Sequence, residues 1–557
     1  MKKIALIILS GVVILNTSCK RYLDINQNPN SATSSTPELI LPQSIVYTAS
    51  VSNTYNTYGA QVGGYAANSG GYGGFGNNFS YTFGPSDYSG LWSASYDALN
   101  DIQYIIDSTK GKLQYAYYNA VATILKVYNY QLLVDAYNNV PFSNSLKGMA
   151  NFTPIYDDAK TIYPLLSNLL DSAILKINTA VPPNGTVNSA LALSATVDPL
   201  FKGTLTSWKQ FANTIKLKLI IRASAKITMP STTFDPAGFL TADAIVNPGY
   251  GRTSSASGTQ VNPTFNSWVA TYSGGKGNRS WVPSKYAFAF YGGTGAKLID
   301  NARGTVVYYN FAAGTTGTAQ LGVLNQGTAN GNTGNWYDAA FTNPGTSVAA
   351  GTGLTTVGNS IGVMKGPDMG QPLMLAAESY FLQAEAILRS IPGVTGTDAA
   401  AFNNGITQSF SYLYKLANGA FPSAPPASGP NSGLHDYSST GVTTDVNAYL
   451  AANPTSYLVR YALATTPAQK LEAIITQKYI ALNMIHSHEA WNEYRRTGYP
   501  ISDGSLSATT SFSSTQSTSG RSDKLPTRIQ YPQSEFNYNQ ANVPIVNVLT
   551  DLIFWAK

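Results

Sequence analysis

Apolar side chains recur at helical spacing in several long segments of this 557-residue chain, and these segments follow one another as neighbours. An amphipathic helix cannot bury its apolar face alone, so neighbouring helices are expected to stack in pairs, as in a tetratricopeptide solenoid. We therefore predict a mainly α-helical fold built from helical pairs, although the pairs are not similar enough to establish a repeat. The predicted helices begin near Pro37 and then cover 91–108, 113–137, 157–178, 204–226, 372–390, 398–417 and 467–487.

Long segments without helical spacing separate these helices. Residues 63–90 are rich in Gly, Tyr, Phe and Asn, and Gly, Thr, Ser and Asn dominate 228–366. Loops of this length are usually functional or disordered. A Ser- and Thr-rich stretch at 502–523 is predicted to be an exposed loop. We predict a single domain over 37–557 that carries a loop-rich insertion at about 228–366.

The N-terminus has the pattern of a secretory signal. Lys2 and Lys3 precede an apolar stretch over 4–15, which is shorter than the roughly 20 residues that a membrane-spanning helix needs. Cys19 is the only cysteine, and it directly follows the small residues at 17–18, as at a bacterial lipoprotein cleavage site. We predict a signal peptide over 1–18, lipidation of Cys19 and a polar, lipidated tether over 19–36.

Composition excludes several classes of protein. Charged residues make up 11% of the chain, and 34 Lys and Arg stand against 28 Asp and Glu without a basic run. Nucleic acid is therefore not an expected partner. A single Cys excludes an intramolecular disulfide and a cysteine-rich zinc site, and three His leave little room for a histidine metal centre. We expect no cofactor and no metal.

The candidate catalytic groups are better explained as structural. His486 and His488 lie two residues apart and do not match the spacing of a zinc protease. Glu378 and Glu385 share one face of a predicted helix, which is interpreted as scaffold and not as a glycosidase acid pair. The glycine-rich run at 70–76 lacks the Lys-Ser/Thr of a phosphate-binding loop. We predict no catalytic residue.

Aromatic residues outside the helices are the remaining signal for a ligand. Sugar rings stack on aromatic side chains while neighbouring polar groups bond the hydroxyls. The segments 63–90 and 260–340 carry aromatics without helical spacing, so we predict the ligand site between them. Each candidate could instead be a local packing anchor. The candidates are Tyr72, Phe75, Trp281 and Trp336, followed by Trp268.

Six sequence blocks occur in order along most of the chain. They are Cys-Lys-Arg-Tyr-Leu-Asp-Ile-Asn at 19–26, Val-Pro-Phe at 140–142, Asp-Pro-Leu-Phe-Lys-Gly at 198–203, Asp-Asn-Ala-Arg at 300–303, Glu-Ser-Tyr-Phe-Leu-Gln-Ala-Glu-Ala at 378–386 and Leu-Pro-Thr-Arg-Ile-Gln-Tyr-Pro at 525–532. Together they resemble the SusD/RagB family of outer-membrane nutrient-binding lipoproteins of Bacteroidetes.

The resemblance implies a superhelix of tetratricopeptide-like pairs with an elaborated loop-rich side. It also implies a lipid-anchored, surface-exposed protein at the outer membrane, partnered with a TonB-dependent (SusC-like) β-barrel transporter. In such proteins the helices dock the transporter and the loops bind glycans or peptides. Lys20 and Arg21 follow Cys19 where surface lipoproteins of this group often carry acidic residues. The face of the membrane on which the chain is displayed therefore stays open.

Three functions remain distinct hypotheses. The first is a non-catalytic lipoprotein that binds nutrient oligomers, glycans above all, and delivers them to the transporter. The second is a lipid-anchored glycoside hydrolase or peptidase, and the third is a scaffold that binds only protein. The sequence does not identify the ligand.

Overall fold

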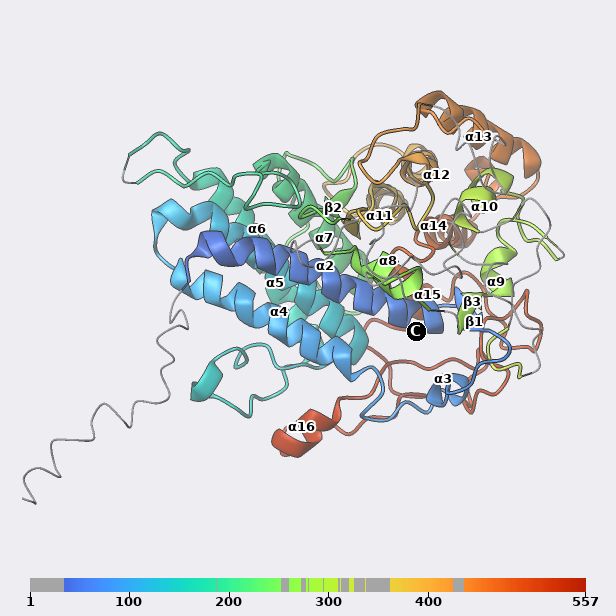
Figure 1. The fold of residues 1–557 in the computed structure, drawn as a ribbon, viewed down its shortest axis with the longest axis horizontal. Helices are drawn as coiled ribbons and strands as arrows, with labels where there is room; N and C mark the ends of the chain where they lie inside the picture. The colour runs from blue at the N-terminus through green and yellow to red at the C-terminus, as the bar shows by residue number, and fades with distance from the viewer. Residues whose placement is uncertain are drawn as a thin grey trace, which may run out of the picture.

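A computed structural model describes residues 35–186, 188–251, 260–271, 277–278, 280–293, 295–308, 311, 320–324, 336, 361–423 and 435–557. Helices dominate these residues, which confirms the predicted fold class (Figure 1). Cys19 and most of the predicted tether lie outside the described residues, as does part of the predicted insertion. The boundaries of the single domain stay a prediction.

Two groups of long helices form the body of the molecule. The first comprises α2 (Pro37–Val62), α4 (Ser89–Ser108), α5 (Ala116–Tyr137), α6 (Ala159–Thr179) and α7 (Leu205–Ala223). The second comprises α11 (Ala376–Leu388), α12 (Asp398–Tyr414), α13 (Ser439–Ala452), α14 (Pro467–Ala481) and α15 (Ser487–Thr497). The predicted partners α4 and α5, α6 and α7, and α11 and α12 pack against each other (Figure 1).

Local capping explains where several of these helices begin. Pro37 stands in the first turn of α2, where its fixed φ is compatible with a helix and its missing N–H is not needed. The Thr397 hydroxyl accepts from the Ala400 N–H at the start of α12. At the start of α14, Thr466 and Gln469 form a reciprocal capping box.

The loop-rich side of the molecule contains short helices and two pairs of short strands. The short helices are α3 (Asn77–Ser80), α8 (Pro263–Trp268), α9 (Lys285–Phe288), α10 (Asn301–Val307) and α16 (Gln533–Tyr538). Strand β1 (Ala66–Asn68) pairs antiparallel with β3 (Trp281–Pro283), and β2 (Ala244–Val246) pairs antiparallel with β4 (Gln371–Met374). Both pairings join segments far apart in the sequence.

Two predicted helix boundaries were wrong. The helix expected from 372 begins at Ala376, because 371–374 form strand β4 against β2. The helix expected to reach 487 ends at Ala481. Met484 adopts a left-handed φ of 58°, which an α-helix does not contain, and its carbonyl accepts from Asn56 of α2.

The prediction of an exposed loop at 502–523 was also wrong in part. The segment is irregular, but Phe512 is buried and packs its ring 5.0 Å from the rings of both Tyr286 and Tyr494. Ser511 and Ser513 are buried as well and bond to each other at 2.8 Å. A Ser-rich segment can be buried when its hydroxyls bond within it.

A buried ion-pair network joins the two helical groups. Arg222 of α7 contacts Asp135 of α5 and, at 2.5 Å, Glu489 of α15. Lys218 of α7 contacts Glu378 of α11 at 2.7 Å and Glu489 at 3.4 Å. One helix of the first group therefore bonds directly to two helices of the second.

The network continues through α14 and α15. Lys478 lies 3.1 Å from Glu493, and Arg496 contacts both Glu493 and Glu385. Burial alone would raise the pKa of Glu378, but the charge of Lys218, the His486 ring 3.6 Å away and the charge of Lys478 bring it down to about 2. The carboxylate thus stays ionised inside the core.

The N-terminal helix α2 meets α15 almost backbone to backbone. A Cβ on Gly59 would lie 2.0 Å from the backbone nitrogen of His488, so only glycine fits there. Asn56 donates to the Met484 carbonyl at 2.9 Å and accepts from the Ser487 N–H at 2.8 Å. The first long helix is therefore held by residues more than 400 positions later in the chain.

Among the helices of the described residues, none combines the length and the apolar character that crossing a membrane would require.

We expect Glu378→Gln to lower the free energy of unfolding by about 3–5 kcal/mol, because it removes the nearer of the two carboxylates that pair with the buried Lys218 and leaves only Glu489, at 3.4 Å. Denaturant unfolding at neutral pH measures the loss. The matched control is Lys470→Gln, which breaks the partly exposed pair with Asp398 and should cost at most about 1 kcal/mol.

The cost should also depend on pH. The stabilisation from ionised Glu378 is present above its ordinary pKa of 4.5 and is lost as pH falls toward about 2. The gap between the parent and Glu378→Gln should therefore shrink over that interval. Equal losses from Glu378→Gln and Lys470→Gln at neutral pH would contradict the network's role.

Candidate functional site

The two loop segments singled out by their aromatic residues lie side by side in the structure. Strands β1 and β3 bring them together, with Asn68 opposite Trp281 and Ala66 opposite Pro283. The pairing continues in a hydrogen bond of 2.7 Å from the Ser69 N–H to the Ser280 carbonyl. Backbone hydrogen bonds between the two segments therefore explain why they lie together.

Phe75 and Trp281 form the centre of an aromatic cluster at this junction. Their ring centroids lie 5.1 Å apart at an interplanar angle of 89°, and Phe79 stacks on Phe75 at 5.0 Å. Phe75 is 6% and Trp281 8% exposed, so each contributes mainly to packing in this arrangement. Phe79, from α3, is a member of the cluster that the sequence analysis did not select.

Trp268 and Trp336 form a second aromatic pair. Their rings meet edge to face at 5.5 Å, and the two residues are 5% and 3% exposed. Trp268 ends α8, and the carbonyl of the neighbouring Val269 accepts from the Gly277 N–H just before the Trp281 strand. Both indole N–H groups are buried, and neither has a hydrogen-bond partner among the described residues.

Tyr72 is the exposed ring among the five candidates, with 51% of its surface accessible. It stands on the glycine-rich loop, where a Cβ at Gly73, Gly74 or Gly76 would meet open space. Ligand groups can therefore approach the backbone closely on this side.

Amides, hydroxyls and one carboxylate, that of Asp87, lie at the base of the same loop. The Asn77 amide donates to Asp87 at 2.7 Å, and the Tyr88 hydroxyl donates to Gln61 at 2.6 Å. Burial raises the pKa of Tyr88 well above its ordinary value, so the phenol keeps its proton. An exposed ring such as Tyr72 can stack on a sugar ring, and amides that follow it on the chain, at Asn77 and Asn78, can bond sugar hydroxyls.

The Ser- and Thr-rich segment completes this face. Ser514 donates its N–H to the Tyr81 hydroxyl at 3.0 Å, Thr515 donates to the Leu321 carbonyl at 2.9 Å, and the Gln516 amide donates to the Gly322 carbonyl. These contacts tie together three segments that are remote in sequence. The local sequence does not predict these contacts, because a Ser- and Thr-rich segment is typical of a solvent-exposed loop.

The groups considered for catalysis lie in the core. His486 bonds to the Pro372 carbonyl at 3.0 Å, and burial lowers the pKa of His488 to about 3. Glu378 and Glu385 pair with Lys218 and Arg496, as expected of structural residues. In the described part of the chain, no group of three or more His, Cys, Asp and Glu residues is arranged to hold a metal ion.

Two family models match the sequence. One, described as starch-binding proteins associating with the outer membrane, matches residues 29–248, and one for the SusD and RagB outer-membrane lipoproteins matches residues 345–551. Between them they cover both helical groups. The chain belongs to the SusD/RagB family. No curated protein matched the sequence.

Solved structures share the fold at low sequence identity. A SusD homologue from Bacteroides fragilis aligns with a TM-score of 0.61 at 17% identity, over 94% of this chain and 100% of its own. One from Bacteroides uniformis gives 0.60 at 23%, over 93% and 99%. A chitin-binding SusD homologue from Flavobacterium johnsoniae gives 0.59 at 19%, over 93% and 98%.

The two kinds of aromatic residue at this face should respond differently to truncation. We expect Trp281→Ala to lower the free energy of unfolding by about 3–5 kcal/mol, because it removes a buried ring that packs on Phe75. Tyr72→Ala should change it by less than about 0.5 kcal/mol, because the ring is largely in solvent. Denaturant unfolding distinguishes them, and a strongly destabilised Tyr72→Ala variant would contradict the exposed position.

Proposed function

We propose that this protein is a non-catalytic lipoprotein that binds neutral glycans at its loop-rich face and delivers them to a TonB-dependent transporter. The observation that carries the proposal is the exposed Tyr72 ring on an open glycine loop beside buried aromatic residues. Membership in a family described as starch-binding supports it, as does the fold shared with a chitin-binding homologue.

The chemistry of the face favours neutral sugars. Tyr72 offers a flat apolar surface, and the neighbouring amides and hydroxyls of Asn77, Asn78 and Ser80 are uncharged. Such groups bond sugar hydroxyls without requiring a charge on the ligand. The buried rings of Phe75, Trp281, Trp268 and Trp336 act in this proposal as the support that positions the loops, and Tyr72 is the residue that stacks on the ligand.

The binding test incubates the purified protein with soluble chitin oligosaccharides, maltooligosaccharides and short peptides. Loss of a glycan from solution without a new product supports binding. A cleaved product supports the hydrolase or peptidase hypothesis, and no depletion of any probe favours the protein-binding scaffold. Calorimetry then gives the affinity for the depleted glycan.

Tyr72→Ala should weaken that affinity about fivefold to tenfold, since a well-placed ring contributes on the order of 1 kcal/mol beyond its buried area and about 1.4 kcal/mol is tenfold. Tyr538→Ala is the matched control, because Tyr538 is also exposed but lies at the end of α16. Equal affinity of Tyr72→Ala and the parent would place the glycan elsewhere.

The helical side is proposed as the surface that docks the transporter, with the anchor at Cys19. Exposed leucines in and beside the first helical group are the candidate contacts, because exposed apolar surface is what a protein partner would cover. They lie at the start of α2, before α5 and along α6, at Leu39, Leu113, Leu165 and Leu175.

Pull-down of the native lipoprotein in mild detergent should recover a large β-barrel partner. The double variant Leu165→Asp, Leu175→Asp should lose most of that partner, whereas Leu506→Asp, which changes an exposed leucine outside the helices, should retain it.

The variant Cys19→Ala should lose fatty-acid labelling and leave the membrane fraction. Recovery of the lipoprotein alone, or retention of Cys19→Ala at the membrane, would contradict the docking or the anchor respectively.

A further inference from the structure

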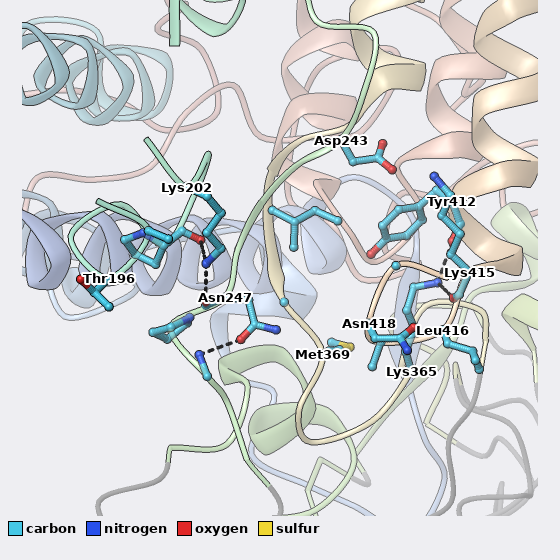
Figure 2. Close-up of a pocket in the computed structure, with 18 of the residues that line it drawn as sticks. Thr196, Lys202, Asp243, Asn247, Lys365, Met369, Tyr412, Lys415, Leu416 and Asn418 are labelled. Carbon is cyan, nitrogen blue, oxygen red and sulfur yellow. Dashed lines mark hydrogen bonds between the residues drawn. The ribbon is translucent and has the colours of Figure 1, made fainter. Parts of the chain in front are cut away.

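The structure contains a pocket of about 850 Å³ that none of the five aromatic candidates lines. Five separate segments form it: α2 at Pro42, the loop at 195–202, the stretch 243–249 around β2, the loop at 365–370, and the end of α12 with the turn that follows (Figure 2). Its volume is typical of sites for small organic ligands, which range from roughly 300 to 1,000 Å³.

Lys365 is a buried cation in the wall of this pocket. It is 5% exposed, donates to the carbonyl oxygens of Tyr412, at 2.6 Å, and Lys415, and lies 4.5 Å from the Tyr412 ring centroid. Within the described residues, Lys365 makes no ion pair with a carboxylate. An ammonium has three donors, so one N–H remains for a ligand.

Two more lysines and one acid complete the charged lining. Lys202 donates to the Pro199 and Asn247 carbonyls, at 3.2 and 3.1 Å (Figure 2). The Lys415 ammonium lies 5.7 Å from the Phe421 ring centroid and makes no ion pair with the described carboxylates. Asp243 accepts from the Ala376 N–H at 2.9 Å. The lining therefore carries three cations and a single anion.

The rest of the lining is apolar or small. Pro42, Pro199, Ile245, Met369 and Leu416 form walls without charge. A ligand that fits must therefore combine an apolar face with a negative charge. The lining contains no arginine, so a bidentate guanidinium contact is not available, and an anion would be held by lysine ammonium groups acting as point charges.

We propose that this pocket binds a small carboxylate-bearing ligand, with its carboxylate held by Lys365 and Lys415 and its apolar face against Met369, Leu416 and Ile245. The carboxylate could belong to an acidic sugar or to the C-terminus of a short peptide, since both present the same group. The site is separate from the proposed glycan face, so either can exist without the other.

The ionisation of Lys365 gives an independent signal of binding. Burial lowers the pKa of Lys365 to about 7, while the charge of Asp243 acts to raise it and that of Lys415 to lower it further. Tyr412 and Lys202 are the other titratable groups in the lining. A carboxylate bound beside Lys365 raises its pKa, so binding near pH 7.5 takes up a proton.

Calorimetry on the purified lipoprotein in mild detergent tests the proposal with four probes. They are digalacturonate, its neutral counterpart galactobiose, the dipeptide Ala-Ala and its C-terminal amide. We expect one of the two acids to bind, with its uncharged counterpart at least tenfold weaker, and the binding acid identifies the source of the carboxylate. A difference in binding enthalpy between buffers of unequal ionisation enthalpy should report the proton uptake.

Variants then place the ligand in this pocket. Lys415→Gln should weaken binding of the acid about fivefold. Lys365→Met should weaken it more than tenfold and abolish the proton uptake. Lys110→Gln, an exposed lysine at the end of α4, is the matched control and should bind as the parent does. Tyr72→Ala should also leave acid binding unchanged.

Because Lys365→Met removes a buried group and could affect folding, Lys415→Gln at the rim decides the result. Unchanged affinity in Lys415→Gln, equal binding of acid and uncharged counterpart, or no binding of either acid would overturn the proposal.

Discussion

The arrangement of both helical groups depends on the ion pairs that Arg222 and Lys218 of α7 make in the core. Their carboxylate partners come from α5, α11 and α15, so a shift of any one helix would leave a charge buried and unpaired. Replacing a whole buried network with apolar residues is often neutral or stabilising, whereas breaking one pair is costly. The network therefore acts mainly to select one relative placement of the helices, in a chain where only 11% of residues are charged.

That fixed helical body lets the opposite side of the molecule be made almost entirely of loops. β1 and β3 are each three residues long, and the neighbouring turns are joined by hydrogen bonds from the backbone N–H groups of Ser514 and Thr515 and from the side-chain amides of Asn68 and Gln516. Aromatic pairs such as Phe75 with Trp281 supply the burial that short strands lack. Loops supported in this way can present an exposed side chain such as Tyr72 while the buried residues keep the shape of the face.

The sequence could predict the elements whose signals are local. Helices with an apolar stripe and a capping Pro or Thr were found, and the two aromatic segments that meet at β1 and β3 were selected. Strand β4 was taken for helix because its pairing partner lies more than 100 residues earlier. Helix α13 was missed because it buries only Gly441, Val442, Asp445 and Tyr449 and shows no apolar stripe. The burial of Trp281 and the pocket around Lys365 depend on contacts between distant segments, which leave no pattern in any one of them.

The contact between α2 and α15 has a consequence for biosynthesis. A ribosome makes α2 first, but the groups that fit around Gly59 and bond Asn56 emerge more than 400 residues later. Until then, the inward face of α2 has no permanent partner in α15, and closing so long a loop carries an entropic cost that only the finished contact repays. The nascent chain therefore completes its tertiary structure after synthesis of nearly its whole length, and for that interval its first helix is a natural substrate for chaperones.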